Sequence, residues 1–248
     1  MPTPPPTPPA PPSALSITVL PPKTYARVFT DPYQEIQSLI FRYELNDADI
    51  KYYCHLKPIR QQGPQCGLVA LAMAAQEYPR KIAAAELYED ARQSGFTQHG
   101  EIYSVDSMAK LAAKYMADHR PEILRNLEDY PYTITRALTS GAKVLIPYDS
   151  DLNNAPTLKR GHKAHWALLV GLISSEQGYH VLARHGKTAR LALWPLADLL
   201  ESNANLEEEG PIRHTGGYVI PDGGVGGKQG LKGRAVALHP CNSPVTSL

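Results

Sequence analysis

Hydrophobic positions are spaced as in helices over the first half of the chain and run together as in strands over the second half. Pro79 and Gly95 end two of the helical segments, and Ser104 is the predicted N-cap of a third. The pattern predicts helices over residues 35–43, 66–78, 82–94, 105–117 and 132–139. It predicts strands over residues 144–146, 165–172, 179–183, 191–194, 217–220 and 235–238. Helices followed by strands indicate an α+β fold, with N-terminal helices packed on an antiparallel sheet.

The helix predicted from residue 66 begins with a thiol. Gly63 and Pro64 reverse the chain just before it, so that Cys66 stands at the helix N-terminus. Unpaired backbone N–H groups and the positive end of the helix dipole are expected to lower the pKa of this thiol toward the physiological range. A lone cysteine is more often a small buried hydrophobe. The glutamine and glycine residues around Cys66 favour a nucleophile instead.

A histidine at the mouth of a predicted strand is the candidate for the base that a thiol nucleophile needs. His165 opens the strand over residues 165–172 and lies far downstream of Cys66, in the Cys-then-His order of papain-like enzymes. A histidine in this place is often only the first residue of an edge strand. Together with the cysteine motif, a catalytic role is the stronger interpretation.

Two segments resemble the actin maturation protease family, a family of cysteine aminopeptidases related to the papain-like C39 peptidases. They are residues 61–71, Gln-Gln-Gly-Pro-Gln-Cys-Gly-Leu-Val-Ala-Leu, and residues 161–167, Gly-His-Lys-Ala-His-Trp-Ala. Residues 100–104 and 147–151 are also similar. The resemblance implies a papain-like cysteine protease fold without a cofactor. It also implies removal of an N-terminally acetylated Cys or Met from immature actin.

The resemblance implies a role for three residues of the site. Cys66 would be the nucleophile of a thiol acyl-enzyme mechanism, and His165 the general base and then the general acid. Papain-like sites use a glutamine upstream of the cysteine as an oxyanion donor. Gln61 is the candidate for that role, with Gln62 as its competitor.

The third member of the site stays open at the level of sequence. A predicted hairpin brings residues 184–186 opposite His165, where relatives of papain keep an Asp or Asn. His185 is one candidate to orient the imidazole, and Asp149 or Asn153 is another, reaching in from a different loop. A two-member site is a further alternative.

Substrate contacts are predicted next to the nucleophile and the base. Gly67 leaves room for a substrate backbone, and Trp166 directly follows the base. The basic residues Lys159, Arg160 and Lys163 precede the base, and their charges would attract acidic residues that follow the scissile bond. The simpler interpretation of this basic stretch is a solvated loop.

Composition fits one enzyme domain. The chain has 248 residues, of which 43% are hydrophobic and 20% charged, and its net charge of +1 gives no reason to invoke nucleic acid or a membrane surface. No apolar stretch of membrane-spanning length and no secretion signal is found, so a cytoplasmic location is expected. Three cysteines argue against a disulfide framework, and without a CxxC pair or HExxH motif no metal site is predicted.

Proline dominates the start of the chain, where residues 1–22 hold ten of the 23 prolines. This composition predicts a disordered tail in polyproline II conformation, the form bound by SH3, WW and profilin-type grooves. Because profilin binds both actin and polyproline, the family resemblance makes profilin the expected partner; a spacer without a partner is the alternative. The peptidase domain is predicted over residues 23–240, with a glycine-rich surface loop at about 221–233 and a flexible C-terminus at 241–248.

Two other functions remain open at this stage. One is a different papain-fold thiol hydrolase, such as a deubiquitinase-like or leader-peptide protease. The other is a non-catalytic adaptor that binds profilin and actin, an alternative that the incomplete triad keeps in view.

Overall fold

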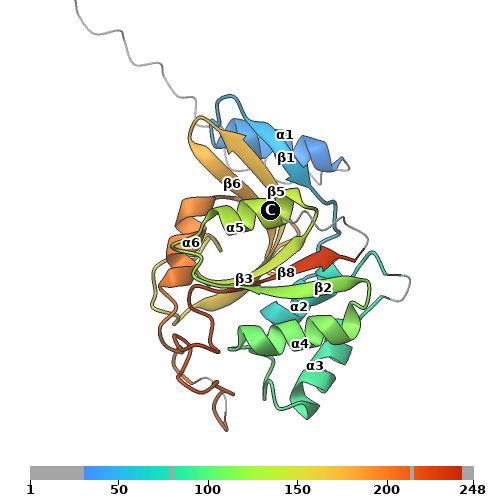
Figure 1. The fold of residues 1–248 in the computed structure, drawn as a ribbon, viewed down its shortest axis with the longest axis vertical. Coiled ribbons are helices and arrows are strands. Elements are labelled where there is room, and N and C mark those ends of the chain that lie inside the picture. Colours follow the sequence, from blue (N-terminus) through green and yellow to red (C-terminus); the bar gives the residue numbers. More distant parts are fainter. Residues whose placement is uncertain (1–30, 79–80, 213–214, 242–248) are drawn as a thin grey trace, which may run out of the picture.

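The computed structural model describes residues 31–78, 81–212 and 215–241 (Figure 1). The predicted proline-rich tail and residues 242–248 lie outside these ranges. The helices are α1 (Pro32–Arg42), α2 (Cys66–Ala74), α3 (Ala84–Gln93), α4 (Val105–Tyr115), α5 (Tyr132–Thr139) and α6 (Leu196–Ala204). The strands are β1 (Asp49–Tyr53), β2 (His119–Leu124), β3 (Lys143–Ser150), β4 (Pro156–Thr157), β5 (Ala164–Ser175), β6 (Gly178–Arg184), β7 (Ala192–Pro195) and β8 (Ala235–Pro240).

One antiparallel sheet forms the centre of the molecule. Its strands follow the order β2-β8-β3-β5-β6-β7, while β1 pairs with β5 and β4 pairs with β3. The longest strand, β5, has 12 residues and pairs with β1, β3 and β6. The predicted α+β class with an antiparallel sheet is therefore confirmed.

Helices cover both faces of this sheet. Along β5, Trp166 and Leu168 belong to the hydrophobic cluster that contains α2 and α4, whereas Ala167 and Leu169 belong to the cluster that contains α5 and α6. Figure 1 shows α2, α3 and α4 grouped below the strands β2, β8 and β3, and α5 and α6 above them. Because successive side chains of a strand point to opposite faces, a strand covered on both faces is apolar at every position. This burial explains the continuous apolar run that follows His165.

The helix α2, which begins at Cys66, is shorter and more deeply buried than its sequence pattern predicts. Every residue of α2 is buried, so that the helix has no solvent face, and it ends at Ala74 well before Pro79. After the helix, the Gln76 carboxamide accepts a hydrogen bond from the backbone N–H of Lys57 and donates one to its carbonyl, at 2.9 and 2.6 Å. This pair of bonds fixes the turn that replaces the last predicted helical residues.

The strand predicted over residues 217–220 is wrong. Gly216 and Gly217 have φ angles of 94° and 75°, which a strand does not accommodate. The glycine-rich segment that follows is more than a surface loop, because Val225 and Leu231 are buried in the core. Leu231 also donates a backbone hydrogen bond of 2.7 Å to the carbonyl of Val225, which closes the segment on itself.

Helices do not simply precede strands, since β1 and β2 stand among the first helices and α6 follows β7. The strand β2 lies at the edge of the sheet and contains Pro121, a residue that edge strands tolerate and central strands do not. The residues of β2 are exposed or half-buried apart from Leu124, which accounts for their polar sequence pattern. Its weak apolar signal is why no strand was predicted there.

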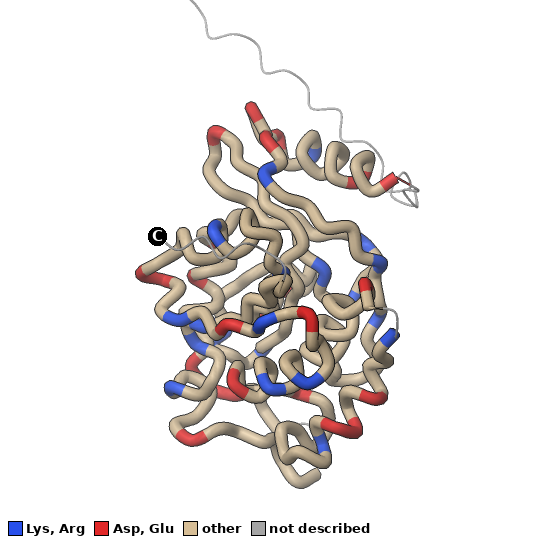
Figure 2. Tube along the Cα trace, turned by 45° about the vertical axis from the view of Figure 1, so that its right-hand side comes forward, with Lys and Arg blue, Asp and Glu red and all other residues tan. Residues whose placement is uncertain are grey.

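Charged residues of both signs are scattered along the described chain (Figure 2). No part of that trace gathers lysine and arginine alone over a large area, in keeping with the net charge of +1. The charges that matter for function therefore have to be found locally, around individual side chains.

Candidate active site

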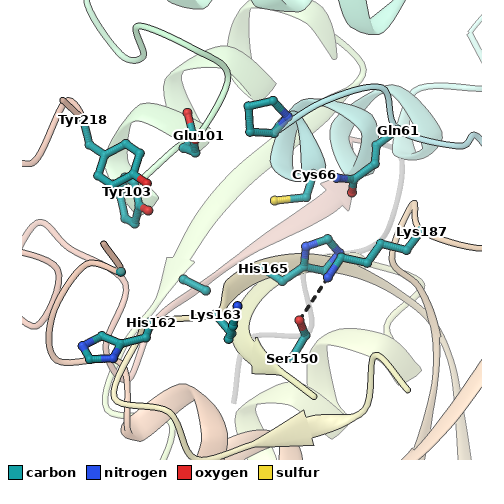
Figure 3. Close-up of a pocket in the computed structure, with 13 residues that line it drawn as sticks. Gln61, Cys66, Glu101, Tyr103, Ser150, His162, Lys163, His165, Lys187 and Tyr218 are labelled. Atoms are coloured by element: carbon teal, nitrogen blue, oxygen red, sulfur yellow. Dashed lines mark hydrogen bonds between the residues drawn. The ribbon is translucent and has the colours of Figure 1, made fainter. Parts of the chain in front are cut away.

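Cys66 is the first residue of α2 and lines a pocket at the end of β5 (Figure 3). The backbone amides of Trp166 and Gly67 favour the thiolate form of its sulfur. The first of these amides belongs to β5 and the second to α2 itself. The thiol is thus held at the contact between the helix and the central strand, with 9% of the residue exposed.

His165 lies on β5 next to the residue whose amide contacts the thiol. Its Nε2 is 2.6 Å from the backbone carbonyl of His185. A carbonyl only accepts hydrogen bonds, so Nε2 carries the proton of the neutral ring, and Nδ1 is the basic nitrogen. Figure 3 shows the ring of His165 facing the side chain of Cys66 across the same pocket. The tautomer is the one that a general base facing the thiol requires.

Burial controls the charge of both residues. Burial raises the pKa of the Cys66 thiol, although the backbone amides of Trp166 and Gly67 and the charge of Lys187 oppose it. Burial also lowers the pKa of His165 to about 3, assisted by the positive charge of Lys187. At neutral pH the resting site therefore holds a thiol and a neutral imidazole. The expected lowering of the thiol pKa by the helix N-terminus is wrong, because lost hydration outweighs the backbone amides.

Gln61 lies beside the thiol, on the segment before α2. Its backbone N–H donates to the carbonyl of Gly186 at 2.8 Å, and its Nε2 donates to the carbonyl of Gly63 at 2.9 Å. Figure 3 shows its carboxamide ending next to Cys66. A carboxamide nitrogen has two N–H bonds, so one remains to donate to an oxyanion. Gln62, its competitor in the sequence, is exposed and is not among the described residues that line the pocket.

The group that orients His165 is a main-chain carbonyl, not a side chain. The ring of His185 lies 6.1 Å from that of His165 and stacks on Trp194 at 6.0 Å, between ring centroids. Its Nδ1 is buried without a hydrogen-bond partner among the described residues. Residue 185 therefore contributes through its backbone, and its imidazole serves the packing below the site.

Asp149 has a different role from the one that its sequence position suggested. Its carboxylate is completely buried and accepts backbone hydrogen bonds from Lys159 at 2.9 Å, Gly161 at 2.7 Å and Lys163 at 2.9 Å. These three donors shape the loop that leads into β5. Asn153, the other candidate from this region, is exposed and donates its backbone N–H to the Asp151 side chain.

Gly67 and Trp166 serve the packing of α2 on β5 rather than the pocket. A Cβ atom at Gly67 would lie 2.7 Å from the Met108 methyl carbon and 3.1 Å from Cδ1 of Trp166. The indole of Trp166 is buried and donates to the carbonyl of Ile102 at 2.9 Å. The glycine thus leaves room for these side chains, not for a substrate backbone.

The predicted basic stretch is only partly at the site. Lys163 lines the pocket, whereas neither Lys159 nor Arg160 is among its described lining residues. Arg160 instead forms exposed ion pairs with Glu207 and Glu208, at 3.1 and 3.4 Å. The structure brings one of the three cations to the pocket.

The pocket also contains residues that the sequence did not single out. Tyr103 and Tyr218 lie with their ring centroids 5.2 Å apart, and Glu101 lies near them (Figure 3). Lys187 donates to the Ser150 hydroxyl at 3.1 Å. Residues 100–104 carried a family-like signal that could have pointed to the tyrosine side. Lys187 follows the end of β6 and had no comparable signal.

Within residues 31–78, 81–212 and 215–241, no group of three or more His, Cys, Asp or Glu side chains is arranged to hold a metal ion. In that part of the chain, no helix has the length and apolar character needed to cross a bilayer.

Comparison with known proteins gives consistent matches. Residues 56–173 match the family model "Actin maturation protease-like, C-terminal domain". Actin maturation protease of Drosophila melanogaster is 38% identical over 193 residues, which cover 75% of this chain and 70% of that protein. The Danio rerio protein of the same name is 34% identical over 219 residues, covering 72% of this chain and 71% of that protein. A crystal structure of a C39-like peptidase from Bacillus anthracis aligns with a TM-score of 0.40 at 14% identity, over 75% of this chain and 98% of that one.

Replacing Asp149 by Asn tests the anchor of the loop before β5. The substitution keeps the size of the side chain, but one amide oxygen cannot accept three backbone N–H groups. We expect the free energy of unfolding to fall by about 2 kcal/mol or more, the cost of stranded buried donors. Urea unfolding measures the change.

Asp151→Asn is the matched control for this substitution. Its Oδ1 alone accepts from the backbone N–H groups of Asn153 and Ala155, at 2.7 and 2.8 Å, and an asparagine keeps that oxygen. The control should change the free energy of unfolding by less than about 0.5 kcal/mol. Equal losses in both variants would contradict the role of Asp149.

The buried histidines predict how stability depends on pH. Burial lowers the pKa of His165 to about 3 and that of His185 to about 4, from an ordinary value of 6.5. Between pH 6.5 and pH 4 the unfolded chain binds more protons at these histidines than the folded chain does. The free energy of unfolding therefore decreases as the pH falls from about 6.5 toward 4. The slope is up to about 1.4 kcal/mol per pH unit for each histidine.

His185→Phe isolates one of the two contributions. Phenylalanine keeps a ring against Trp194 and leaves the backbone carbonyl in place, but it does not titrate. Urea unfolding at a series of pH values should give a shallower decrease for this variant than for the wild type. An unchanged slope would show that the pKa of His185 is ordinary in the folded protein.

Proposed function

The chain belongs to the actin maturation protease family, and we propose that it is a cysteine aminopeptidase that removes an N-terminally acetylated Cys or Met from immature actin. One observation carries the enzymatic part of this proposal. A thiol at a helix N-terminus and an imidazole with Nδ1 as its basic nitrogen line one pocket. Actin as the substrate is proposed from the names of the relatives, and the acetylated first residue from the family resemblance.

In the proposed mechanism, the sulfur of Cys66 attacks the carbonyl carbon of the acetylated first residue while its proton passes to Nδ1 of His165. The oxyanion that forms accepts hydrogen bonds from the Gln61 carboxamide and the backbone N–H of Cys66. The imidazolium then protonates the departing amine, and the C–N bond breaks. Water, deprotonated by His165, hydrolyses the thioester and releases the acetylated amino acid.

The neutral resting state fits this sequence of proton transfers. Because burial and the charge of Lys187 lower the pKa of His165, its protonated form is a strong acid. It is held in place by the His185 carbonyl and gives its proton readily to the leaving amine. Formation of the thiolate is the harder step, and the backbone amides of Trp166 and Gly67 favour it.

Restricted room on one side of the pocket supports an exopeptidase over an endopeptidase. The Tyr103–Tyr218 ring pair stands there, and the segment at Gly210 lies so close to His162 that a Cβ on the glycine would be 2.6 Å from its carbonyl oxygen. A blocked single residue needs a short subsite of this kind, whereas an endopeptidase needs a groove open at both ends.

We place this activity in the cytosol. All three cysteines, Cys54, Cys66 and Cys241, are free thiols, as proteins of reducing compartments usually have. The proline-rich tail lies outside the described residues, and profilin binding stays a prediction from its composition.

Hydrolysis of short acetylated peptides tests the proposed function. The wild type should release acetyl-Met or acetyl-Cys from acetyl-Met-Asp and acetyl-Cys-Asp peptides and leave a ubiquitin-amide substrate intact, as measured by mass spectrometry. Cys66→Ala should abolish release. Gln61→Ala should lower kcat by about 10² to 10³, the usual effect of one oxyanion donor.

Gln62→Ala is the control for Gln61, since residue 62 is exposed and outside the described lining. It should retain the wild-type kcat. Cleavage of ubiquitin-amide alone would favour a deubiquitinase-like hydrolase. No turnover of any peptide, with Cys66 no more reactive toward iodoacetamide than Cys54, would favour an adaptor.

Deletion of residues 1–12 tests the proposed profilin contact. Removing the polyproline run should weaken binding to profilin in a pull-down or titration and leave hydrolysis of a short acetylated peptide unchanged. Equal profilin binding with and without the segment would refute the contact.

A further inference from the structure

Lys187 is a cation beside Cys66 and His165, and it has no role in the proposed mechanism. It follows Gly186, whose carbonyl accepts the backbone N–H of Gln61, and its ammonium group donates to the Ser150 hydroxyl at 3.1 Å. Figure 3 shows its side chain running past the ring of His165, with the nitrogen near Ser150. The cation is thus placed by two strands, β3 and the end of β6.

The two sides of the pocket differ in chemistry. Figure 3 shows Gln61 and Lys187 on one side of the Cys66–His165 pair, and Glu101, Tyr103 and Tyr218 on the other. Acetylation removes the positive charge of a chain terminus, so the blocked first residue is neutral apart from its side chain. The tyrosine side suits that neutral group. An acidic side chain would be repelled there by Glu101 and attracted toward Lys187.

Lys187 is a better partner for a carboxylate than the other cations near the site. Its side chain is half-buried, whereas His162 and Lys163 are both exposed. Attraction between charges is stronger where solvent is partly excluded and weaker where salt screens it. The positive charge of Lys187 acts on the site, since it lowers the pKa of His165.

We infer that Lys187 is a specificity-determining residue that binds the carboxylate of an acidic residue directly after the scissile bond. This inference rests on the proposed function, since it takes the first residue of the substrate to lie on the tyrosine side. The second residue of the substrate is then recognised by Lys187, in the segment after β6, and not by the basic loop over residues 159–163 before β5.

The test compares two peptides that differ in one group, acetyl-Met-Asp-Ala-Ala and acetyl-Met-Asn-Ala-Ala. The ratio of their kcat/KM values measures recognition of the carboxylate, because any effect of Lys187 on the thiol or the imidazole is the same for both peptides. The wild type should prefer the Asp peptide by about tenfold, and added salt should reduce the preference. In Lys187→Met the ratio should fall to about one, and Lys187→Arg should keep most of it.

Charge reversal and matched controls complete the experiment. Lys187→Glu should cleave an acetyl-Met-Lys-Ala-Ala peptide better than the Asp peptide, the reverse of the wild type. Lys163→Met and Lys159→Met remove nearby cations and should keep the Asp to Asn ratio. Ser150→Ala, which frees the ammonium group, should lower the ratio and serves if Lys187→Met does not fold.

The outcomes separate this inference from the proposed function. Wild-type protein that cleaves both peptides at equal rates, or a ratio that survives Lys187→Met, overturns the role of Lys187 and leaves the peptidase intact. If Lys163→Met, and not Lys187→Met, loses the Asp to Asn ratio, Lys163 binds the carboxylate instead, and the inference is likewise overturned. A wild type that cleaves neither peptide refutes the proposed function and this inference with it.

Discussion

The packing of α2 against β5 is the contact on which the site depends. The helix is buried on all sides, and the glycine at its second position lets the Trp166 ring approach to where a Cβ would be 3.1 Å away. This approach brings the Trp166 amide to the sulfur of Cys66, and the residue before Trp166 is His165. The distance between thiol and imidazole is therefore set by helix packing, not by flexible loops. A larger residue at position 67 would push α2 away from β5 and so separate the thiol of Cys66 from the imidazole of His165.

Burial at this contact also decides the electrostatics of the site. A carboxylate hydrogen-bonded to His165 would stabilise the imidazolium and raise its pKa. The His185 carbonyl fixes the same tautomer with a dipole instead of a charge, and the charge of Lys187 acts against the imidazolium. The result is a thiol and an imidazole that are both neutral at neutral pH.

The sequence predicted the parts of the fold that have local signals. The Gly63-Pro64 turn and the apolar run after it located the start of α2, and the apolar stretch from His165 located β5. Tertiary contacts decided the rest. β2 was missed because an edge strand with Pro121 lacks an apolar pattern, and the end of α2 was misplaced because the Gln76 side chain fixes the turn after it. Neither cause is visible in the spacing of hydrophobic residues.

In the candidate site, the sequence predicted side chains but not backbone groups. Cys66, His165 and Gln61 were predicted because their residue types carry the chemistry. Residue 185 was also predicted opposite His165, but through its imidazole. Its carbonyl was not predicted as the partner, because a backbone carbonyl has no residue type.

The buried carboxylate near the site, Asp149, has a structural role: it holds the loop that leads to His165. It accepts three backbone hydrogen bonds, and the last of the three donors, Lys163, lies two residues before His165. The ring of Tyr148, the residue before Asp149, meets the His165 ring edge-on, with 5.7 Å between the centroids. The chain that carries His165 is therefore anchored just before the ring, and the His185 carbonyl holds the ring itself. With the backbone fixed on one side and the imidazole on the other, the ring has little freedom to turn its Nδ1 away from the thiol. A charged third side chain is not needed for that orientation.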